Sequence, residues 1–264
     1  MPNLRCLLNL PQQALLATLA FLLMSAAPAR AQTTTAPTAA TASTSSLPAR
    51  SASVDAKNLA PGFAGLNRSD KVLLMPVDVE LFSISGGGVS EPKADWTASA
   101  QRYMADEMRK LRMALRLDAV EMSEQAADEF GEQVGLHAAV ASSIALHHGM
   151  GGPWALPTKA GKLDWRFDDA MQPLAAKTGA RYGLFVWVRD SYASAERKAV
   201  MVGLALLGVG IAGGVQVGYA SLVDLQTGQV VWFNRLARGS GDLREAASAR
   251  ESMDALLAGF PAVR

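Results

Sequence analysis

Two apolar segments separated by a short glycine-containing loop constrain the fold of this 264-residue chain more than any other feature. Residues 215–225 and 229–234 are rich in valine, leucine and aromatic side chains, and Gln226-Thr227-Gly228 lies between them. Strand-forming runs joined by so few residues pair with each other as a β-hairpin. The sequence therefore predicts an antiparallel hairpin near its end, followed by a last helix at about 243–257.

Other strands and helices precede the hairpin. Residues 71–82 form an apolar run that then alternates, which predicts a first strand in which Pro76 fits a bulge or the strand's end. The aromatic and β-branched segment 181–190 predicts a central strand. Because strands separated by helices tend to pair in parallel, the predicted fold class is α/β: a mixed sheet with helices packed on it, a C-terminal antiparallel hairpin and a final helix. Apolar spacings of three and four, a capping Ser123 and a terminal Gly179 predict the intervening helices at 95–117, 123–146 and 168–178.

The N-terminal region predicts export. Residues 1–31 read as a signal peptide, with a basic start, an apolar stretch and small residues before a cleavage site after Ala31. Residues 32–65 are rich in Thr, Ala, Ser and Pro and predict a disordered tether, because they offer little apolar surface to bury. Residues 66–264 are then expected to form a single α/β domain. The protein is expected in the periplasm, with association with the outer membrane as a further option.

Two stretches of the sequence resemble a known family. One is the first predicted strand with its Pro76, and the other is 221–232, where an apolar strand, an aspartate, Thr-Gly and a second apolar strand with a tryptophan follow one another. Here the chain resembles envelope proteins of the curli-secretion (CsgG-like) and TolB amino-terminal-domain group. More narrowly, it looks like an uncharacterised family of exported proteobacterial proteins. The resemblance implies an α/β module that assembles with itself or with cell-wall and outer-membrane machinery, with no catalytic residues to carry over. Cys6 is not in a lipobox, which departs from the lipoproteins of this group.

The most unusual segment is 199–217, where nineteen residues carry no charge and glycines recur. Periodicity cannot decide whether such a run is a buried element or one that contacts a membrane. An exposed apolar patch of this kind marks an interaction site. The partner-contact candidates are Gly203, Gly208, Val209, Gly210, Ile211, Gly213, Gly214 and, from the hairpin, Trp232.

Other motifs resemble functional sites, but a structural interpretation is favoured for each. The pattern GxGxxG at 208–213 matches dinucleotide-binding folds, but strand-like residues follow it where a helix is needed. His147 and His148 are adjacent and diverge on a helix, so a solvated helix end is favoured over a metal site, as it is for His137. Ser191, Ser194 and Lys198 are residue types of serine–lysine catalysis, but we interpret them as part of a polar loop. Asp78 and Glu80 could act as an acid–base pair, but we interpret them as an edge that repels other strands.

These observations predict a non-enzymatic periplasmic envelope module that binds a protein partner or self-associates, in outer-membrane or cell-wall assembly or transport. The alternative is a membrane-inserting or pore-associated component that uses 199–217. No cofactor, metal site or catalytic residue is predicted. A net charge of +1 over the whole chain offers no electrostatic footprint for nucleic acid.

Overall fold

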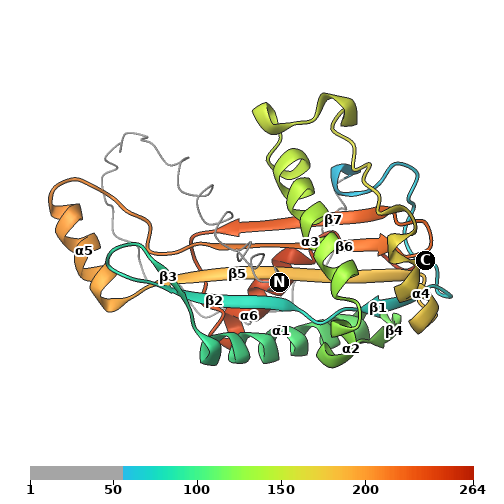
Figure 1. The fold of residues 1–264 in the computed structure, drawn as a ribbon, viewed down its shortest axis with the longest axis horizontal. Helices are drawn as coiled ribbons and strands as arrows, with labels where there is room; N and C mark the ends of the chain where they lie inside the picture. Colours follow the sequence, from blue (N-terminus) through green and yellow to red (C-terminus); the bar gives the residue numbers. More distant parts are fainter. Residues whose placement is uncertain (1–55) are drawn as a thin grey trace, which may run out of the picture. The chain divides into compact units, whose positions relative to one another are not determined.

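The computed structural model describes residues 56–264, so the predicted signal peptide and most of the predicted tether lie outside the described residues. Figure 1 shows a mixed sheet with helices packed on it, which confirms the predicted fold class. The strands are β1 (Lys71–Leu74), β2 (Asp78–Ile84), β3 (Ser90–Pro92), β4 (Asp118–Glu121), β5 (Tyr182–Ala193), β6 (Gln216–Asp224) and β7 (Val230–Arg238). The α-helices are α1 (Ala94–Leu115), α2 (Glu124–Asp128), α3 (Gly131–Ile144), α4 (Gln172–Thr178), α5 (Ala195–Leu206) and α6 (Ala246–Leu256).

Strand β5 is central because it pairs along both of its sides. On one side β6 runs antiparallel to it, and β7 pairs in turn with β6. On the other side β1 and β2 follow one another, both parallel to β5, with Val72 opposite Tyr182 and Asp78 opposite Trp187. The predicted parallel pairing and the predicted C-terminal hairpin are therefore both confirmed.

The first strand is interrupted, where the sequence predicted one strand over 71–82. The Met75 N–H still donates to the Leu184 carbonyl oxygen at 3.1 Å, but Pro76 has no N–H to continue the ladder. The chain leaves the sheet there and resumes as β2. The break gives the two halves different outer neighbours, since β4 pairs with β1 and β3 pairs with β2.

Apolar side chains of the sheet are buried on both faces. Helices α1 and α6 pack with one set of strand residues, in a cluster that holds Met104, Leu222 and Trp232. Helices α3 and α4 pack with the alternate set, which includes Phe185 and Phe233. Successive strand side chains point to opposite faces, so both faces of the central strands contribute to the core.

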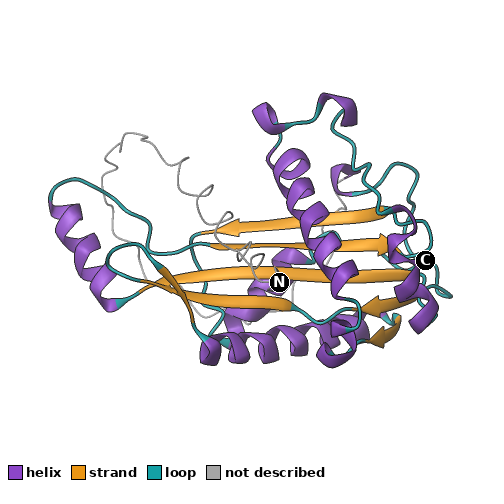
Figure 2. Ribbon diagram, viewed as in Figure 1, coloured by secondary structure: helices purple, strands orange, loops and turns teal. Residues whose placement is uncertain are grey.

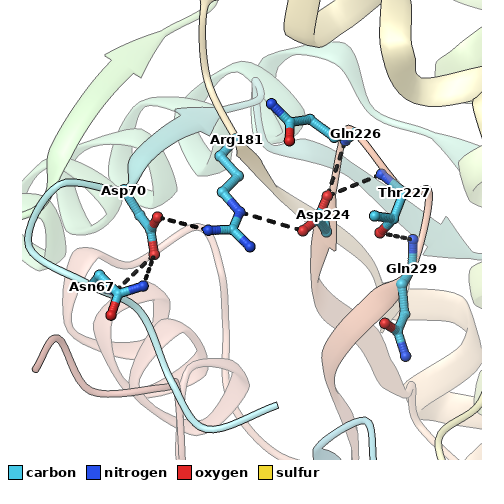
Figure 3. Close-up of polar contacts among 7 residues, drawn as sticks. All are labelled: Asn67, Asp70, Arg181, Asp224, Gln226, Thr227 and Gln229. Atoms are coloured by element: carbon cyan, nitrogen blue, oxygen red, sulfur yellow. Dashed lines mark hydrogen bonds and ion pairs between the residues drawn. The ribbon is translucent and has the colours of Figure 1, made fainter. Parts of the chain in front are cut away.

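A polar cluster fixes the hairpin turn, as Figure 3 shows. The Asp224 Oδ1 atom accepts hydrogen bonds from the backbone N–H groups of Gln226 and Thr227, both at 3.0 Å. Arg181 lies between two buried carboxylates, with Nε 3.5 Å from Asp224 Oδ2 and Nη1 3.3 Å from Asp70 Oδ1. This bridge joins the turn to the starts of β1 and β5, so the aspartate of the hairpin motif has a structural role.

The helical region 123–146 is divided, although it was predicted as one helix. Ser123 caps α2 as predicted, since its Oγ accepts from the Ala126 N–H at 3.2 Å. Helix α2 is short, however, because Phe130 leaves helical geometry and turns into the core before α3 begins. A π-helix, Ala145–Met150, continues α3. The third predicted helix begins as a 3₁₀ turn, Asp168–Met171, and α4 ends at Gly179 in the left-handed conformation, as predicted.

Residues 56–65, within the range predicted as a tether, lie against the hairpin. The Ala60 N–H donates to the Val231 carbonyl oxygen at 2.9 Å, and Ala60 is buried. The Phe63 ring meets the Tyr182 ring edge to face, with centroids 6.0 Å apart. The described structure thus contains contacts of the domain before residue 66.

Candidate contact arm

Helix α5 and the segment that returns from it, residues 207–215, form an extension between β5 and β6, here called the arm. Figures 1 and 2 show α5 beyond the ends of the sheet strands. The helix begins at Ser194, whose Oγ accepts from the Arg197 N–H at 3.2 Å. The uncharged run 199–217 comprises the end of α5 (199–206), the return segment (207–215) and the first two residues of β6.

Large apolar side chains on the arm are exposed. Leu206 is 84% exposed and Leu207 is 77% exposed. The other exposed large apolar residues of the arm are Val200, Val202, Val209 and Val215. Surface apolar residues that occur singly are ordinary, but a group gathered on one projecting segment marks a contact site.

The root of the arm is held by Arg197 and Ser191. The Arg197 side chain is buried, and its Nε and Nη2 donate to the Ala212 carbonyl oxygen at 3.2 and 2.9 Å. The Ser191 Oγ accepts from the Val215 N–H at 3.0 Å, and the Ser191 N–H donates to the Val215 carbonyl oxygen at 3.2 Å. These bonds join helix and return segment at their bases, so the arm leaves the sheet in a defined direction.

The arm glycines divide into three groups. Gly214 lies so close to β5 that a Cβ there would be 1.9 Å from the Ser191 carbonyl oxygen, and at Gly213 it would be 3.2 Å from Met201 Cε. Gly208 has φ +77°, which ends the helix. At Gly203 and Gly210 a Cβ would meet nothing within 4 Å, so packing inside the described protein does not require glycine at either position.

The remaining two contact candidates lie in different places. Ile211 is half-buried on the return segment. Trp232 is fully buried in β7, with its ring edge to face against Phe260 at 5.3 Å between centroids. Its expected place in a contact surface is therefore corrected: Trp232 belongs to the core, because its side chain points to the face that α6 covers.

The three histidines do not come together. His137 is buried in α3, where its Nε2 lies 2.6 Å from Ser221 Oγ and its ring stacks on Phe185 at 3.9 Å. Burial lowers the pKa of His137 to about 3, so the imidazole is neutral near neutral pH. His147 Nδ1 and His148 Nε2 bond different backbone carbonyl oxygens, those of Trp154 and Lys57.

These positions correct the solvated-helix-end interpretation for two of the histidines. His137 and His148 are both buried, and burial lowers the pKa of His148 as well. Within residues 56–264, no group of three or more His, Cys, Asp or Glu side chains could hold a metal ion. Ser221 is fully buried too, so its pairing with His137 is a contact of the core.

The other motifs also have structural roles. Ser191 and Ser194 bond backbone groups at the root of the arm, while Lys198 is exposed. The glycine pattern 208–213 follows a helix and leads into a strand, which is the reverse of a dinucleotide-binding turn.

Asp78 and Glu80 lie in the part of β2 that pairs with β5 alone, because β3 pairs with β2 only over Phe82–Ile84. Both carboxylates are paired with Arg189, with Nη1 2.7 Å from Asp78 Oδ1 and Nε 3.3 Å from Glu80 Oε2. The Arg189 guanidinium also lies 4.7 Å from the centre of the Trp187 ring. The pair therefore lies at an open stretch of the β2 edge, and its strand-repelling role stays a prediction.

Sequence reasoning missed two buried polar groups at the root of the arm. One is Arg197. The other is Asp190, which accepts from Gln216 Nε2 at 2.8 Å and from the Tyr192 hydroxyl. Burial raises the pKa of Asp190, and these hydrogen bonds act against that shift. A polar residue within a central strand was the available signal for Asp190, whereas nothing local marks the partner of Arg197.

A cavity of about 300 Å³ lies at the break between β1 and β2. Its lining includes Pro76, Glu124, Asp128, His137 and Trp187.

Among the described residues, no helix is both long enough and apolar enough to cross a bilayer. The arm, with its exposed apolar side chains, is the described feature that best matches the predicted contact function.

Comparison with known proteins gives only distant likenesses. No protein-family model matches the chain, and no curated protein matches it. Similar solved structures include a PelC dodecamer from Paraburkholderia phytofirmans, at 17% identity, covering 75% of this chain and 93% of that chain with a TM-score of 0.35. Lipoprotein GNA1162 from Neisseria meningitidis is 13% identical, covering 65% of this chain and 81% of that chain with a TM-score of 0.28.

The C-terminal domain of LpoB from Salmonella enterica is 14% identical, covering 68% of this chain and 87% of that chain with a TM-score of 0.24. TM-scores this low carry no argument about function or assembly. None of these three structures is a CsgG or TolB protein, so the resemblance noted in the sequence stays a prediction.

Proposed function

We propose that the chain is a non-enzymatic module of the cell envelope that acts in the periplasm and binds a protein partner or a second copy of itself through the arm. The observation that carries the proposal is the group of exposed apolar side chains on an arm with a fixed root. Leaving such side chains in water is unfavourable, and a partner that covers them gains the free energy of their burial. The Arg197 and Ser191 bonds hold the arm in place before the partner arrives, which lowers the entropic cost of binding.

The return segment offers a second kind of contact. Within residues 56–264, the backbone groups of Gly210, Ile211 and Gly213 make no hydrogen bond. An extended backbone with open donors and acceptors can pair with another chain, and glycine lets that chain approach closely. Gly210 suits this role because the space beside its Cα is open.

Two further expectations belong to this proposal. Export to the periplasm rests on the signal-peptide pattern of residues 1–31. A non-enzymatic role is supported by the burial of the histidine and serine side chains that could supply a nucleophile and its base, His137 and Ser221.

The test measures association of the purified protein by light scattering and by crosslinking from a photoreactive residue at Val209. We expect an oligomer or a crosslinked partner with the native chain, and loss of both with Gly210→Asp. The matched control is Gly239→Asp, which places the same charge at another exposed glycine with open space around it. A chain that stays monomeric and yields no protein crosslink in intact cells would contradict the proposal.

A further inference from the structure

We infer that the outer part of the arm, residues 200–209, binds the surface of a phospholipid bilayer by inserting its apolar side chains among the lipids. This goes beyond the proposed function, because it gives the apolar side chains at the end of α5 a lipid environment, whereas the proposed function gives the arm a protein contact. Three features carry it: the distribution of apolar side chains around the helix, the state of its backbone, and the position of the nearest charges.

Apolar side chains lie on opposite sides of α5. Successive residues of a helix are rotated by about 100°, which places Val200 and Leu207 on one side and Val202 and Leu206 on the other. All four are exposed, at 41, 77, 64 and 84% respectively. A flat protein surface covers one side of a helix, whereas lipid surrounds an inserted segment on every side. A helix that is apolar all round is typical of buried or membrane environments.

The last N–H groups of the helix are already paired, while the carbonyl oxygens of Leu206 to Val209 accept no hydrogen bond among the described residues. The N–H groups of Leu207 and Gly208 donate to the carbonyl oxygens of Leu204 and Ala205, both at 3.0 Å, and the Val209 N–H donates to Leu204 at 2.9 Å. Lipid cannot replace hydrogen bonds, so paired N–H groups enter it at low cost, whereas the open carbonyl oxygens of the helix end must stay at the level of the head groups and water. In the return segment, Gly210, Ile211 and Gly213 have neither backbone donor nor acceptor paired among the described residues, which assigns that segment to water or protein rather than to lipid.

Charges on the arm are confined to its root. Glu196, Arg197 and Lys198 lie in the first turn of α5, and no charged residue follows until after Val217. The uncharged helical part, residues 199–206, is about 12 Å long at 1.5 Å per residue. An interfacial helix buries its apolar side chains about 5 to 10 Å deep, so the tip can reach that depth while the root stays in water. The exposed root charges Glu196 and Lys198 are of opposite sign, so we expect little preference for anionic lipid.

The first test places an environment-sensitive fluorophore at Leu207→Cys in a Cys6→Ser background, using vesicles of phosphatidylethanolamine and phosphatidylglycerol. We expect a blue shift on adding vesicles and quenching by nitroxide-bearing lipids, equally in low and high salt. Met113→Cys is the matched control, because Met113 is a 70% exposed apolar residue on α1. Its emission should not change.

The second test is vesicle flotation of protein purified from cells. Leu206→Asp with Leu207→Asp should reduce the partition coefficient about tenfold or more, whereas Met113→Asp should leave it unchanged. These side chains are exposed, so the variants are expected to keep the native circular dichroism spectrum. An unshifted probe at Leu207 would overturn the inference. So would a blue shift that grows with protein concentration in the absence of lipid, which would assign the tip to a second copy. Loss of lipid binding leaves the Gly210→Asp result intact, so the two proposals fail separately.

Discussion

Helices α1 and α5 both carry apolar side chains but bury opposite kinds of residue. Helix α1 buries Ala100, Met104, Met108 and Leu111, a stripe at helical spacing that faces the sheet. In α5 the one buried residue is Arg197, and Val200, Val202 and Leu206 are exposed. The first arrangement stabilises the fold. The second leaves apolar side chains in water, a cost that the proposed contact of the arm would remove.

The largest expected effect tests this contrast directly. Met104→Ala removes a fully buried side chain from α1 and should lower the free energy of unfolding by about 2 to 5 kcal/mol. Leu206→Ala removes an exposed side chain from α5 and should change it by less than about 0.5 kcal/mol. Urea unfolding followed by circular dichroism measures both. Equal losses would mean that α5 packs on the domain in solution, and the contrast would be broken.

Buried polar groups allow a second comparison, which uses pH. His137 on α3 has a folded-state pKa of about 3, below its ordinary value of 6.5 because of burial. Below pH 6.5 the unfolded chain binds a proton that the folded chain does not bind until about pH 3. The stability contributed by neutral His137 is therefore complete above pH 6.5 and falls by about 1.4 kcal/mol per pH unit as the pH drops through that window.

Urea unfolding between pH 7 and pH 4 measures this slope. His137→Gln should flatten it, whereas His147→Gln, at a partly exposed position, should keep it. Some slope will remain in the His137 variant because burial also lowers the pKa of His148. Identical slopes for the native chain and His137→Gln would show that water reaches this part of the core.

The smallest effect concerns Arg197, the buried residue of α5. Arg197→Met keeps the length of the side chain but removes both hydrogen bonds to the Ala212 carbonyl oxygen, at a local cost of about 1 to 3 kcal/mol. Hydrogen exchange of 207–215 should become faster while the midpoint of global unfolding stays nearly constant. Lys198→Met, at the exposed neighbouring position, should change neither quantity. A large drop in global stability would instead make the arm part of the folding core.

The parts of the fold that the sequence predicted are those with a periodic pattern. Helix α1 has an uninterrupted apolar stripe, β5 is a long run of β-branched and aromatic residues, and the hairpin has both strands and a turn within a few positions. Strands β3 and β4 are only three and four residues long, too short to show any period. The division between α2 and α3 depends on Phe130 entering the core, which is a tertiary effect.

The arm could be predicted as a place of contact but not as a structure. The absence of charge over 199–217 was visible, yet an apolar run without periodicity fits helix and strand equally. Arg197 lies just before that run, and its bond to Ala212 joins residues that only the folded chain brings together. Trp232 was misplaced for a related reason: its residue type suits an interface, but the direction of its side chain depends on the register of β7.

The pairing of Asp190 with Gln216 closes the ladder between β5 and β6 directly below the arm. The chain therefore leaves and re-enters the sheet at adjacent positions, as it would around an ordinary hairpin loop. Replacing the residues after Ala193 and before Val215 with a short loop would preserve the strand registers, because β5 pairs with β2 as far as Ala193. The length and the residue composition of this insertion can therefore change during evolution without disturbing the sheet.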